Sequence, residues 1–287
     1  MRRSGLGWVL ALAWSLAARV GAQDGGPYFH QVLSASSPDG LRFTHDGAVL
    51  LEHASVPAAV VLDDGRLRLY YVDASTRPEN VNCAESLDGG RSFAVLGCTI
   101  AWRSGVKAVD PSPVRLPDGR LRLFYYAPDT QSPDAPGRHS VYSAVSADGV
   151  AFAEEGLAFT WEGLVDPDVF WSGREWLMYV FALGQTTLMA HSDDGRNFTY
   201  LGPLPLEGWG TTAPVRLPDG RLRLYAFDQP RAQVVASFLS EDGLAWTREE
   251  GLRLEAEPGF QLTDPFVVRL PDGSWKMFYK RSAAPAR

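Results

Sequence analysis

The sequence predicts an all-β protein, a five-bladed β-propeller whose blades are four-stranded antiparallel sheets. The main observation is a hairpin motif that occurs five times, as in VDPSPVRLPDGRLRLFYY: an apolar strand opened by a proline, a tight turn, and a second strand ending in aromatic residues. The opening prolines are Pro57, Pro111, Pro167, Pro214 and Pro265. A repeat of about 50 residues with four strands per unit is typical of propeller blades.

A second motif supplies the other hairpin of each unit. Its copies are SPDGLRF, SLDGGRSF, SADGVAF, SDDGRNF and SEDGLAW. Ser and Asp side chains hydrogen-bond to nearby backbone groups and Gly accepts a positive φ, so each copy predicts a tight turn. The aromatic residue that ends each copy should pack inward. Two hairpins per unit then give the four strands of one blade.

The two ends of the chain are expected to complete one blade between them. The N-terminal segment predicts strands at about residues 29–36 and 42–44, whereas the last repeat, TDPFVVRLPDGSWKMFY, stops after its second strand. We therefore expect the N-terminal hairpin to complete the C-terminal blade. This closure would leave the ring without an open sheet edge.

The first 22 residues have the features of a secretory signal peptide. Two arginines precede an apolar run at residues 6–18, which is too short and wrongly flanked for a membrane span, and the small residues 20–22 offer a cleavage site. Removal of residues 1–22 would leave residues 23–287 as a single propeller domain, secreted to the extracellular or periplasmic space. The alternative is an uncleaved N-terminal anchor.

The net charge of the chain limits the classes of partner that it is suited to bind. The chain of 287 residues has a formal net charge of −7, and the signal segment contributes three arginines and no acid, so the mature chain is more acidic still. An acidic chain without a run of basic residues is poorly suited to nucleic acid or to an anionic membrane. We expect neither partner, and we expect the mature protein to be a monomer.

The two cysteines, Cys83 and Cys98, flank the SLDGGRSF turn on what should be adjacent antiparallel strands. Nearly opposite positions on paired strands, in an exported chain, favour a disulfide. Two buried thiols are the alternative. The pair lacks histidines at ligand spacing and so does not match a zinc site.

The DGRLRL segments alternate polar and apolar residues with the period of two that is typical of a strand. Their arginines are expected to share one outward face and to be solvated, as part of the blade surface rather than of a site. These arginines are Arg66, Arg68, Arg120, Arg122, Arg221 and Arg223.

A functional site is expected where the first strands of the blades line the axis. The loops before these strands and between the two hairpins fall at one end of the channel and vary among blades, whereas the turns at the other end are alike. The residue before the opening proline is an aspartate in three blades, Asp110, Asp166 and Asp264, and is apolar in the other two, Val56 and Ala213.

Three aspartates near one axis allow three interpretations. Paired carboxyls can do acid–base chemistry because burial and mutual repulsion separate their pKa values. They can bind Ca²⁺ through oxygen ligands, or each can fix a strand start by accepting backbone hydrogen bonds. Asp168 should join Asp166 on one side of its strand, since strand residues alternate. No cofactor is required, and a Ca²⁺ ion in the central channel is compatible with the pattern.

The loops at the same end carry acids, bases and aromatic residues. This mixture suits a polyhydroxylated ligand, whose hydroxyls need donors and acceptors and whose CH faces stack on rings. Core packing is the alternative for any one tryptophan. The candidate substrate-binding residues are Trp102, Arg103, Lys107, Arg138, His139, Asp168 and Trp209.

The order DP, strand, DG, strand ending in YY, then SxDGxxF resembles the five-bladed propellers of family 43 glycoside hydrolases, the arabinanases, arabinofuranosidases and xylosidases. The resemblance covers the whole mature chain and implies a polysaccharide or oligosaccharide partner. The SLDGGRSF copy also resembles the Asp-box of sialidases, which is a structural turn remote from the sialidase site. The chain shows no arginine triad with a tyrosine nucleophile.

The family resemblance implies an Asp base, a second Asp that orients and tunes pKa values, and a Glu acid. The base position, in the first blade, is Val56 in this chain. The fourth blade, where the acid normally stands, opens with Thr212 and Ala213, and the nearest acid is Glu207. Asp166 matches the second Asp. Two of the three catalytic positions thus depart from the family pattern.

A rotated functional frame is one way to restore the catalytic set. Taking the third blade as the first makes Asp166 the base, places Asp264 two blades on, and gives the acid role to Glu52. An inverting pair of carboxyls must be about 6.5–9.5 Å apart to admit a water molecule.

The function expected from the sequence is that of a secreted glycoside hydrolase relative that cleaves glycosidic bonds with inversion. Asp110 or Asp166 would act as base and Asp264 as the orienting carboxylate. Glu52 or Glu207 would act as acid. One alternative is a non-catalytic propeller that binds glycan or protein, favoured by the two apolar positions before opening prolines. A further alternative is a sialidase-like exo-glycosidase.

Overall fold

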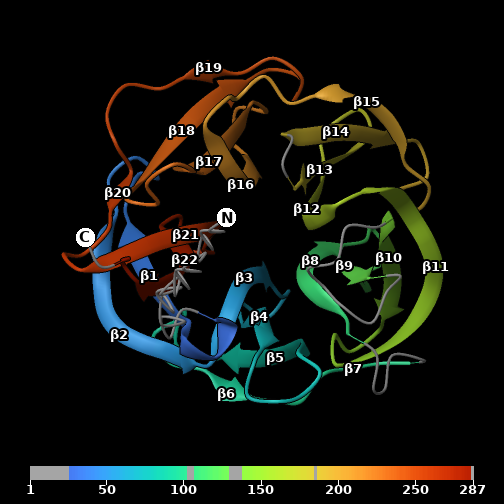
Figure 1. Cartoon of the computed structure of the whole chain (residues 1–287), viewed down its shortest axis with the longest axis horizontal. Coiled ribbons are helices and arrows are strands. Elements are labelled where there is room, and N and C mark those ends of the chain that lie inside the picture. The colour runs from blue at the N-terminus through green and yellow to red at the C-terminus, as the bar shows by residue number, and fades with distance from the viewer. Residues whose placement is uncertain (1–25, 102–106, 129–137, 184–185, 286–287) are drawn as a thin grey trace, which may run out of the picture.

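The structure, a computed structural model, describes residues 26–101, 107–128, 138–183 and 186–285. It confirms the predicted all-β fold. Five small sheets are arranged as blades around a central axis (Figure 1). Consecutive strands within the four-stranded blades pair antiparallel, so each blade is a meander that runs outward from the axis.

Blades one and two come first in the chain. The strands of blade one, from the axis outward, are β3 (Ala54–Val61), β4 (Leu67–Asp73), β5 (Asn80–Ser86) and β6 (Ala94–Val95). Those of blade two are β8 (Val109–Arg115), β9 (Leu121–Pro128), β10 (Arg138–Ser146) and β11 (Ala151–Glu162), with β7 (Thr99–Ile100) parallel to β11 at the rim.

Blades three and four follow the same plan. The strands of blade three are β12 (Leu164–Trp171), β13 (Trp176–Ala182), β14 (Thr187–Ser192) and β15 (Thr199–Pro203). Those of blade four are β16 (Trp209–Arg216), β17 (Leu222–Asp228), β18 (Val234–Ser240) and β19 (Thr247–Arg248), with β20 (Leu254–Glu255) also paired to β18.

Blade five closes the ring as predicted. Its strands are β21 (Phe260–Arg269), β22 (Trp275–Ala283), β1 (Gln31–Ser37) and β2 (Thr44–Glu52), and one 3-10 turn, η1 (Pro27–Phe29), precedes β1. β1 pairs with β22 from Gln31 opposite Arg281 to Ser37 opposite Trp275. β2 is longer than the sequence predicted and ends at Glu52, close to the start of blade one.

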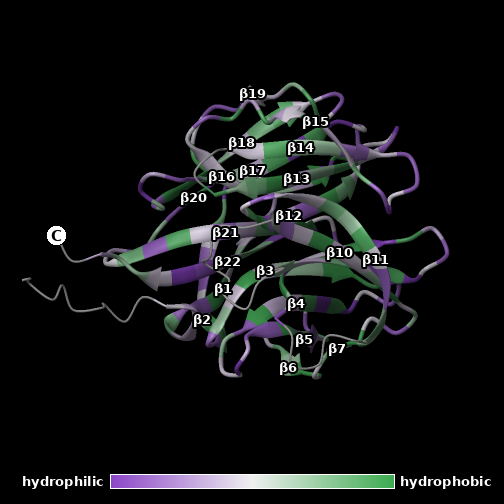
Figure 2. Ribbon diagram, turned by 45° about the vertical axis from the view of Figure 1, so that its right-hand side comes forward, coloured by the Kyte–Doolittle hydropathy of each residue, from purple (hydrophilic) through white to green (hydrophobic). Residues whose placement is uncertain are grey.

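The S-x-D-G motifs form the expected turns. In blade two the Ser146 hydroxyl donates to Asp148 Oδ1 at 2.7 Å and accepts from the Gly149 amide at 2.9 Å, while Asp148 Oδ1 also accepts from the Val150 amide at 2.8 Å. The hydrophobic stretches of the strands and the hydrophilic turns between them are visible in Figure 2. Among the described residues, no helix has the length and apolar character needed to cross a membrane.

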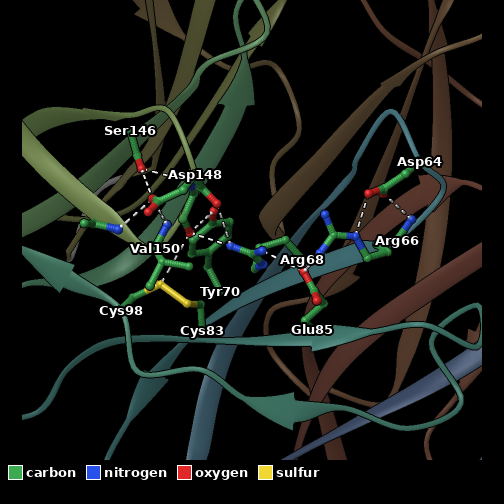
Figure 3. Close-up of polar contacts among 12 residues, drawn as sticks. Asp64, Arg66, Arg68, Tyr70, Cys83, Glu85, Cys98, Ser146, Asp148 and Val150 are labelled. Carbon is green, nitrogen blue, oxygen red and sulfur yellow. Dashed lines mark hydrogen bonds and ion pairs between the residues drawn. A yellow bond between two sulfur atoms is a disulfide. The ribbon is translucent and has the colours of Figure 1, made fainter.

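Each of these turns also packs against the second strand of the preceding blade. Tyr70 on β4 donates its hydroxyl to the carbonyl oxygen of Gly149 at 2.8 Å, and Arg68 donates to the same oxygen at 2.9 Å (Figure 3). Tyr225 on β17 bonds in the same way to the carbonyl of Gly40, at 2.7 Å. The motif therefore joins neighbouring blades as well as closing its own hairpin.

The expectation that the six DGRLRL arginines are solvated is wrong for half of them. Arg68, Arg122 and Arg223 are buried, with exposures of 4%, 7% and 8%. They pair with acids on outer strands or loops of their own blades, namely Glu85, Glu155 and Glu249. Their strand face is covered by the turn of the next blade, a contact that strand periodicity alone does not reveal. The other three pair with the aspartates of their own turns; Arg120 and Arg221 are exposed, and Arg66 is half-buried and also pairs with Glu85.

The predicted disulfide between Cys83 and Cys98 is present, with a Cα–Cα distance of 5.3 Å. The expected positions on directly paired strands are wrong in detail. β6 pairs opposite Ala84 and Glu85, and Cys98 follows in the segment that leads to β7. The bond therefore anchors the connection from blade one to blade two.

Candidate functional site

The inner strands β8, β12 and β21 bring Asp110, Asp166 and Asp264 to the axis. In each strand the register with its partner shifts beside the aspartate, as in a β-bulge, which re-aims a side chain. The three residues have φ angles of 55°, 51° and 50°. Asp is one of the few residues that accept this left-handed conformation readily, so the same local backbone recurs in three blades.

Blade one keeps this backbone without the carboxylate. Val56 has a φ angle of 46° at the equivalent shift in β3. A β-branched residue at positive φ is a genuine outlier, and such strain gathers at functional sites. In blade four the shift lies between Gly210 and Thr212, one step before Ala213.

The three aspartates form one electrostatic group with Lys280 of β22. The main-chain amide of Asp166 donates to Asp110 Oδ2 at 3.3 Å. Lys280 Nζ lies 2.5 Å from Asp264 Oδ2, and its charge acts on all three carboxyls. The hydroxyl of Thr211 donates to Asp264 Oδ1 at 2.9 Å.

Burial and neighbouring charges move the pKa values of the three aspartates apart. It raises the pKa of Asp110 to about 6, with a further contribution from the charge of Asp264. Burial, followed by the charges of Asp110 and Asp264, raises the pKa of Asp166 well above its ordinary value. Two interacting carboxyls in such surroundings ionise less easily than isolated ones, because each negative charge disfavours the other.

Asp264 behaves in the opposite way. Burial would raise its pKa, but the Lys280 ammonium and the hydroxyls of Thr211 and Thr263 outweigh burial and hold the pKa below its ordinary value. The pKa of Lys280 is raised in turn because the attraction of Asp264 exceeds the penalty of burial. Asp264 and Lys280 therefore form an ion pair beside two carboxyls whose pKa values are raised.

A small cavity of about 30 Å³ opens on the axis beside these groups. Asp166, Asp168 and Asp264 line it, together with Thr212 and Val56. Asp168 and Asp166 both line this cavity, although the register of β12 shifts at Asp166 and so interrupts the simple alternation assumed from the sequence. Its carboxyl accepts a hydrogen bond from the Thr212 hydroxyl at 3.3 Å, and burial raises its pKa well above the ordinary value.

Lys107, predicted to bind substrate, lies just before β8 and contributes positive charge at Asp110. Its Nζ is 3.1 Å from Glu79 Oε2, and Glu79 belongs to the loop between the two hairpins of blade one. Neither Glu79 nor Lys280 was among the residues chosen from the sequence. Glu79 lies in a between-hairpin loop, which faces this end of the channel, whereas Lys280 lies within β22 just after the aromatic residues of that strand.

The two predicted acids lie away from this cavity. Glu52 is exposed at the end of β2, the outermost strand of blade five, and accepts a hydrogen bond from Gln31 Nε2 at 2.9 Å. Glu207 is exposed in the loop before β16. Neither side chain is among the described residues that line the axial cavity. The structure therefore gathers the aspartates but not the glutamates.

The other candidate residues have varied positions. His139 is a buried strand residue rather than a loop residue, and its Nδ1 lies 2.8 Å from the carbonyl oxygen of Leu164. Trp209 begins β16, where its ring packs against Phe238 at 5.5 Å and lies under the Arg248 guanidinium at 5.1 Å. Trp102 and Arg103 fall outside the described residues, and Arg138 is described only as the first residue of β10.

The geometry of the axial group bears on the Ca²⁺ ion predicted from the sequence. In the part of the chain that the structure describes, no group of three or more His, Cys, Asp or Glu side chains is arranged to hold a metal ion. Lys280 supplies a positive charge to the aspartates instead. A Ca²⁺ ion in the channel therefore remains a prediction from the sequence.

No protein-family model matches the chain, and no curated protein matches it in sequence. Solved structures match it in fold. A thermostable family-43 glycoside hydrolase has a TM-score of 0.61 and 12% identity, covering 82% of this chain and 90% of its own. The α-L-arabinanase of Penicillium chrysogenum, in complex with arabinobiose, has a TM-score of 0.58 and 16% identity, covering 85% of this chain and 76% of its own.

An N-acetylgalactosamine deacetylase from F. plautii, in complex with blood group B trisaccharide, has a similar fold. Its TM-score is 0.60 at 13% identity, covering 88% of this chain and 95% of its own. These matches confirm the likeness to the five-bladed propellers of family 43. At such identities they establish architecture alone, and function must be argued from the site.

Proposed function

We propose that the protein is a secreted carbohydrate-active enzyme that hydrolyses a glycosidic bond at the axial cavity. The observation that carries this proposal is the group of three aspartates in which burial raises the pKa values of Asp110 and Asp166 while Lys280 lowers that of Asp264. Carboxyls whose environments push their pKa values apart are suited to separate acid and base roles. The family-43 architecture and the disulfide, typical of exported proteins, support the proposal.

The roles follow from the directions of the pKa shifts. Asp166 lines the cavity and burial raises its pKa well above the ordinary value, so it would donate a proton to the departing glycosidic oxygen. Asp110 ionises above about pH 6 and would accept a proton from the attacking water. Asp264, held ionised by Lys280, would orient the sugar and stabilise positive charge that develops at the anomeric carbon. The expected partner is an oligosaccharide or polysaccharide.

Hydrolysis of a panel of aryl glycosides tests this assignment. The panel contains arabinofuranoside, xyloside, galactofuranoside, mannoside and sialoside. With the substrate that is turned over, Asp166→Asn and Asp110→Asn should each lower kcat by about 100-fold or more, the range of general acid–base catalysis. Asp219→Asn is the control, because Asp219 lies on an exposed turn of blade four and bonds only to neighbouring Arg221 in the described structure.

The glutamates are tested in the same assay. Loss of activity in Glu52→Gln, Glu207→Gln or Glu79→Gln, with Asp166→Asn still active, would move the acid role to that glutamate. The acidic limb of the kcat/KM profile should lie near pH 6, where Asp110 ionises. Inversion is checked by the anomer that first appears in the NMR spectrum of the product. Activity equal in both aspartate variants and the control would refute the site.

A second candidate function, a glycan-binding propeller without turnover, is supported by one observation. Val56 and Ala213 occupy two positions where the family resemblance implies acidic residues. Absence of hydrolysis on the whole panel, together with calorimetric binding of an arabinan or xylan oligosaccharide, would favour this function. The sialidase-like alternative has no such support, because its turn motif serves here to join neighbouring blades.

A further inference from the structure

The opposite end of the channel has an opening of its own. This lower cavity, of about 440 Å³, is lined by the second halves of the inner strands. Asp168 and Phe266 line both the lower cavity and the axial cavity. They therefore separate two compartments that share one channel. Asp166 and Asp264 line the upper compartment alone, and Asp110 lines neither.

Three arginines line this lower cavity. Arg115, Arg216 and Arg269 are the last residues of β8, β16 and β21, and all three are exposed. Arg115 forms an ion pair with Asp63. Arg216 and Arg269 have no hydrogen bond or ion pair among the described residues, and both also line an adjoining hollow of about 350 Å³. Arg216 and Arg269 thus border the same openings without an acidic partner among the described residues, and Arg269 lies beside its own hairpin turn, where a Cβ added at Gly273 would be 3.2 Å from its Nη2.

An exposed tryptophan completes the lower cavity. Trp171 is the last residue of β12, lies 41% exposed, and is braced by Trp176, whose ring centroid is 5.5 Å away at an interplanar angle of 64°. Arg216 reaches toward the turn that follows Trp171, because a Cβ added at Gly173 would lie 3.3 Å from Arg216 Nη2. A guanidinium and an open indole face thus border the same opening.

We propose that the lower cavity binds an acidic sugar. Guanidinium groups recognise carboxylates and other oxyanions through paired N–H donors. Arg216 and Arg269 would hold the carboxylate of a uronate residue, and the apolar face of its ring would stack on Trp171. The site is independent of the upper aspartates.

Calorimetry with the full protein tests this proposal. The probes are a galacturonate trisaccharide, a neutral galactose trisaccharide of the same length, and sodium sulfate. We expect the uronate to bind and the neutral sugar not to bind. Arg216→Gln with Arg269→Gln should weaken uronate binding by about tenfold or more, as expected for the loss of charged hydrogen bonds. Raised salt should weaken it as well.

Arg221→Gln is the matched control, because Arg221 is exposed on the blade-four hairpin but pairs with Asp219. It should leave uronate binding unchanged. Trp171→Ala should weaken binding of the uronate while leaving any binding of sulfate unchanged. Uronate affinity equal in the double variant and the control would overturn the proposal, as would absence of uronate binding. Sulfate binding as tight as uronate binding would overturn the sugar assignment. Circular dichroism confirms folding of each variant.

Discussion

The main-chain amide of Asp166 donates a hydrogen bond to Asp110 Oδ2 in the adjacent blade, at 3.3 Å. This bond joins blade three to blade two at the point where two carboxyls approach each other. It favours the ionised form of Asp110, yet burial outweighs it and keeps the pKa at about 6. The axial group is therefore poised to change its charge between weakly acidic and neutral pH.

Asp110 should make stability depend on pH. Because its folded pKa of about 6 exceeds the unfolded value of 3.8, the folded state binds the proton more tightly, and stability is lost as pH rises from about 4 through 6. Relative to Asp110→Asn, the wild-type free energy of unfolding should fall by roughly 2–3 kcal/mol over this window. Urea unfolding of both proteins at four pH values measures this difference. Asn is a suitable replacement for Asp110 because it also accepts the left-handed backbone conformation.

Asp118→Asn serves as the control for this measurement, because Asp118 is half-exposed and bonded to Arg120 on its own turn. Parallel stability curves for wild type and Asp110→Asn across pH 4–7 would contradict the assignment of the raised pKa to Asp110.

Arg223 should stabilise the folded protein far more than Arg221 on the same hairpin. Arg223 is buried and holds Glu249 by two hydrogen bonds of 2.7 and 3.0 Å, so Arg223→Met leaves a half-buried carboxylate without its partner. The expected loss in the free energy of unfolding is about 3 kcal/mol. Arg221→Met removes an exposed pair and should cost about 0.5 kcal/mol or less. Denaturant titration measures the free energy of unfolding of both variants. Equal losses would show that the buried Arg223–Glu249 pair contributes no more to stability than the exposed pair.

Gly149 should tolerate a methyl group less well than Gly119. Both have positive φ angles, 70° and 86°, so alanine costs about 1–2 kcal/mol at either position. A Cβ at Gly149 would also lie 2.7 Å from Leu121 Cδ1 and 2.9 Å from the Tyr70 hydroxyl, whereas Gly119 has open space. Gly149→Ala should cost about 1–3 kcal/mol more than Gly119→Ala because of this overpacking. Similar melting temperatures for the two variants would argue against tight packing between blades one and two.

The Cys83–Cys98 disulfide should contribute to stability by restricting the unfolded chain. The cysteines are separated by 15 residues, for which removal of the bond costs about 3 kcal/mol. The double variant with both cysteines changed to alanine should show a lower urea midpoint than oxidised wild type. Reductant should lower the wild-type midpoint and leave that of the double variant unchanged. No effect of reductant on wild type would mean that the bond does not constrain the unfolded state.

Much of the fold could be predicted because its signals are local. A Ser, an Asp and a Gly within four residues make their own turn, as Ser146, Asp148 and Gly149 do. Each opening proline marks one blade, and the incomplete last repeat implies ring closure. The burial of Arg68 could not be predicted, because the group that covers it, Gly149, comes from the next blade, about 80 residues on.

The candidate site was predictable in part for the same reason. Asp110, Asp166 and Asp264 stand at equivalent places in their repeats, and blade symmetry brings equivalent places to one axis. Lys280 follows the aromatic residues that end its repeat. Nothing in the adjacent sequence marks it as the partner of Asp264. Glu52 and Glu207 looked suitable by their spacing from an opening proline, yet their side chains lie away from the cavity.

The sequence by itself determined the strands, the turns, the number of blades and the convergence of three aspartates, since each depends on residues close together or repeated at a constant spacing. Tertiary structure decided the protonation states of those aspartates, because burial and the charge of Lys280 act through space. It also decided which arginines are buried between blades and which, like Arg216 and Arg269, remain unpaired at the lower opening. Desolvation and charge pairing depend on neighbours that only the closed ring supplies.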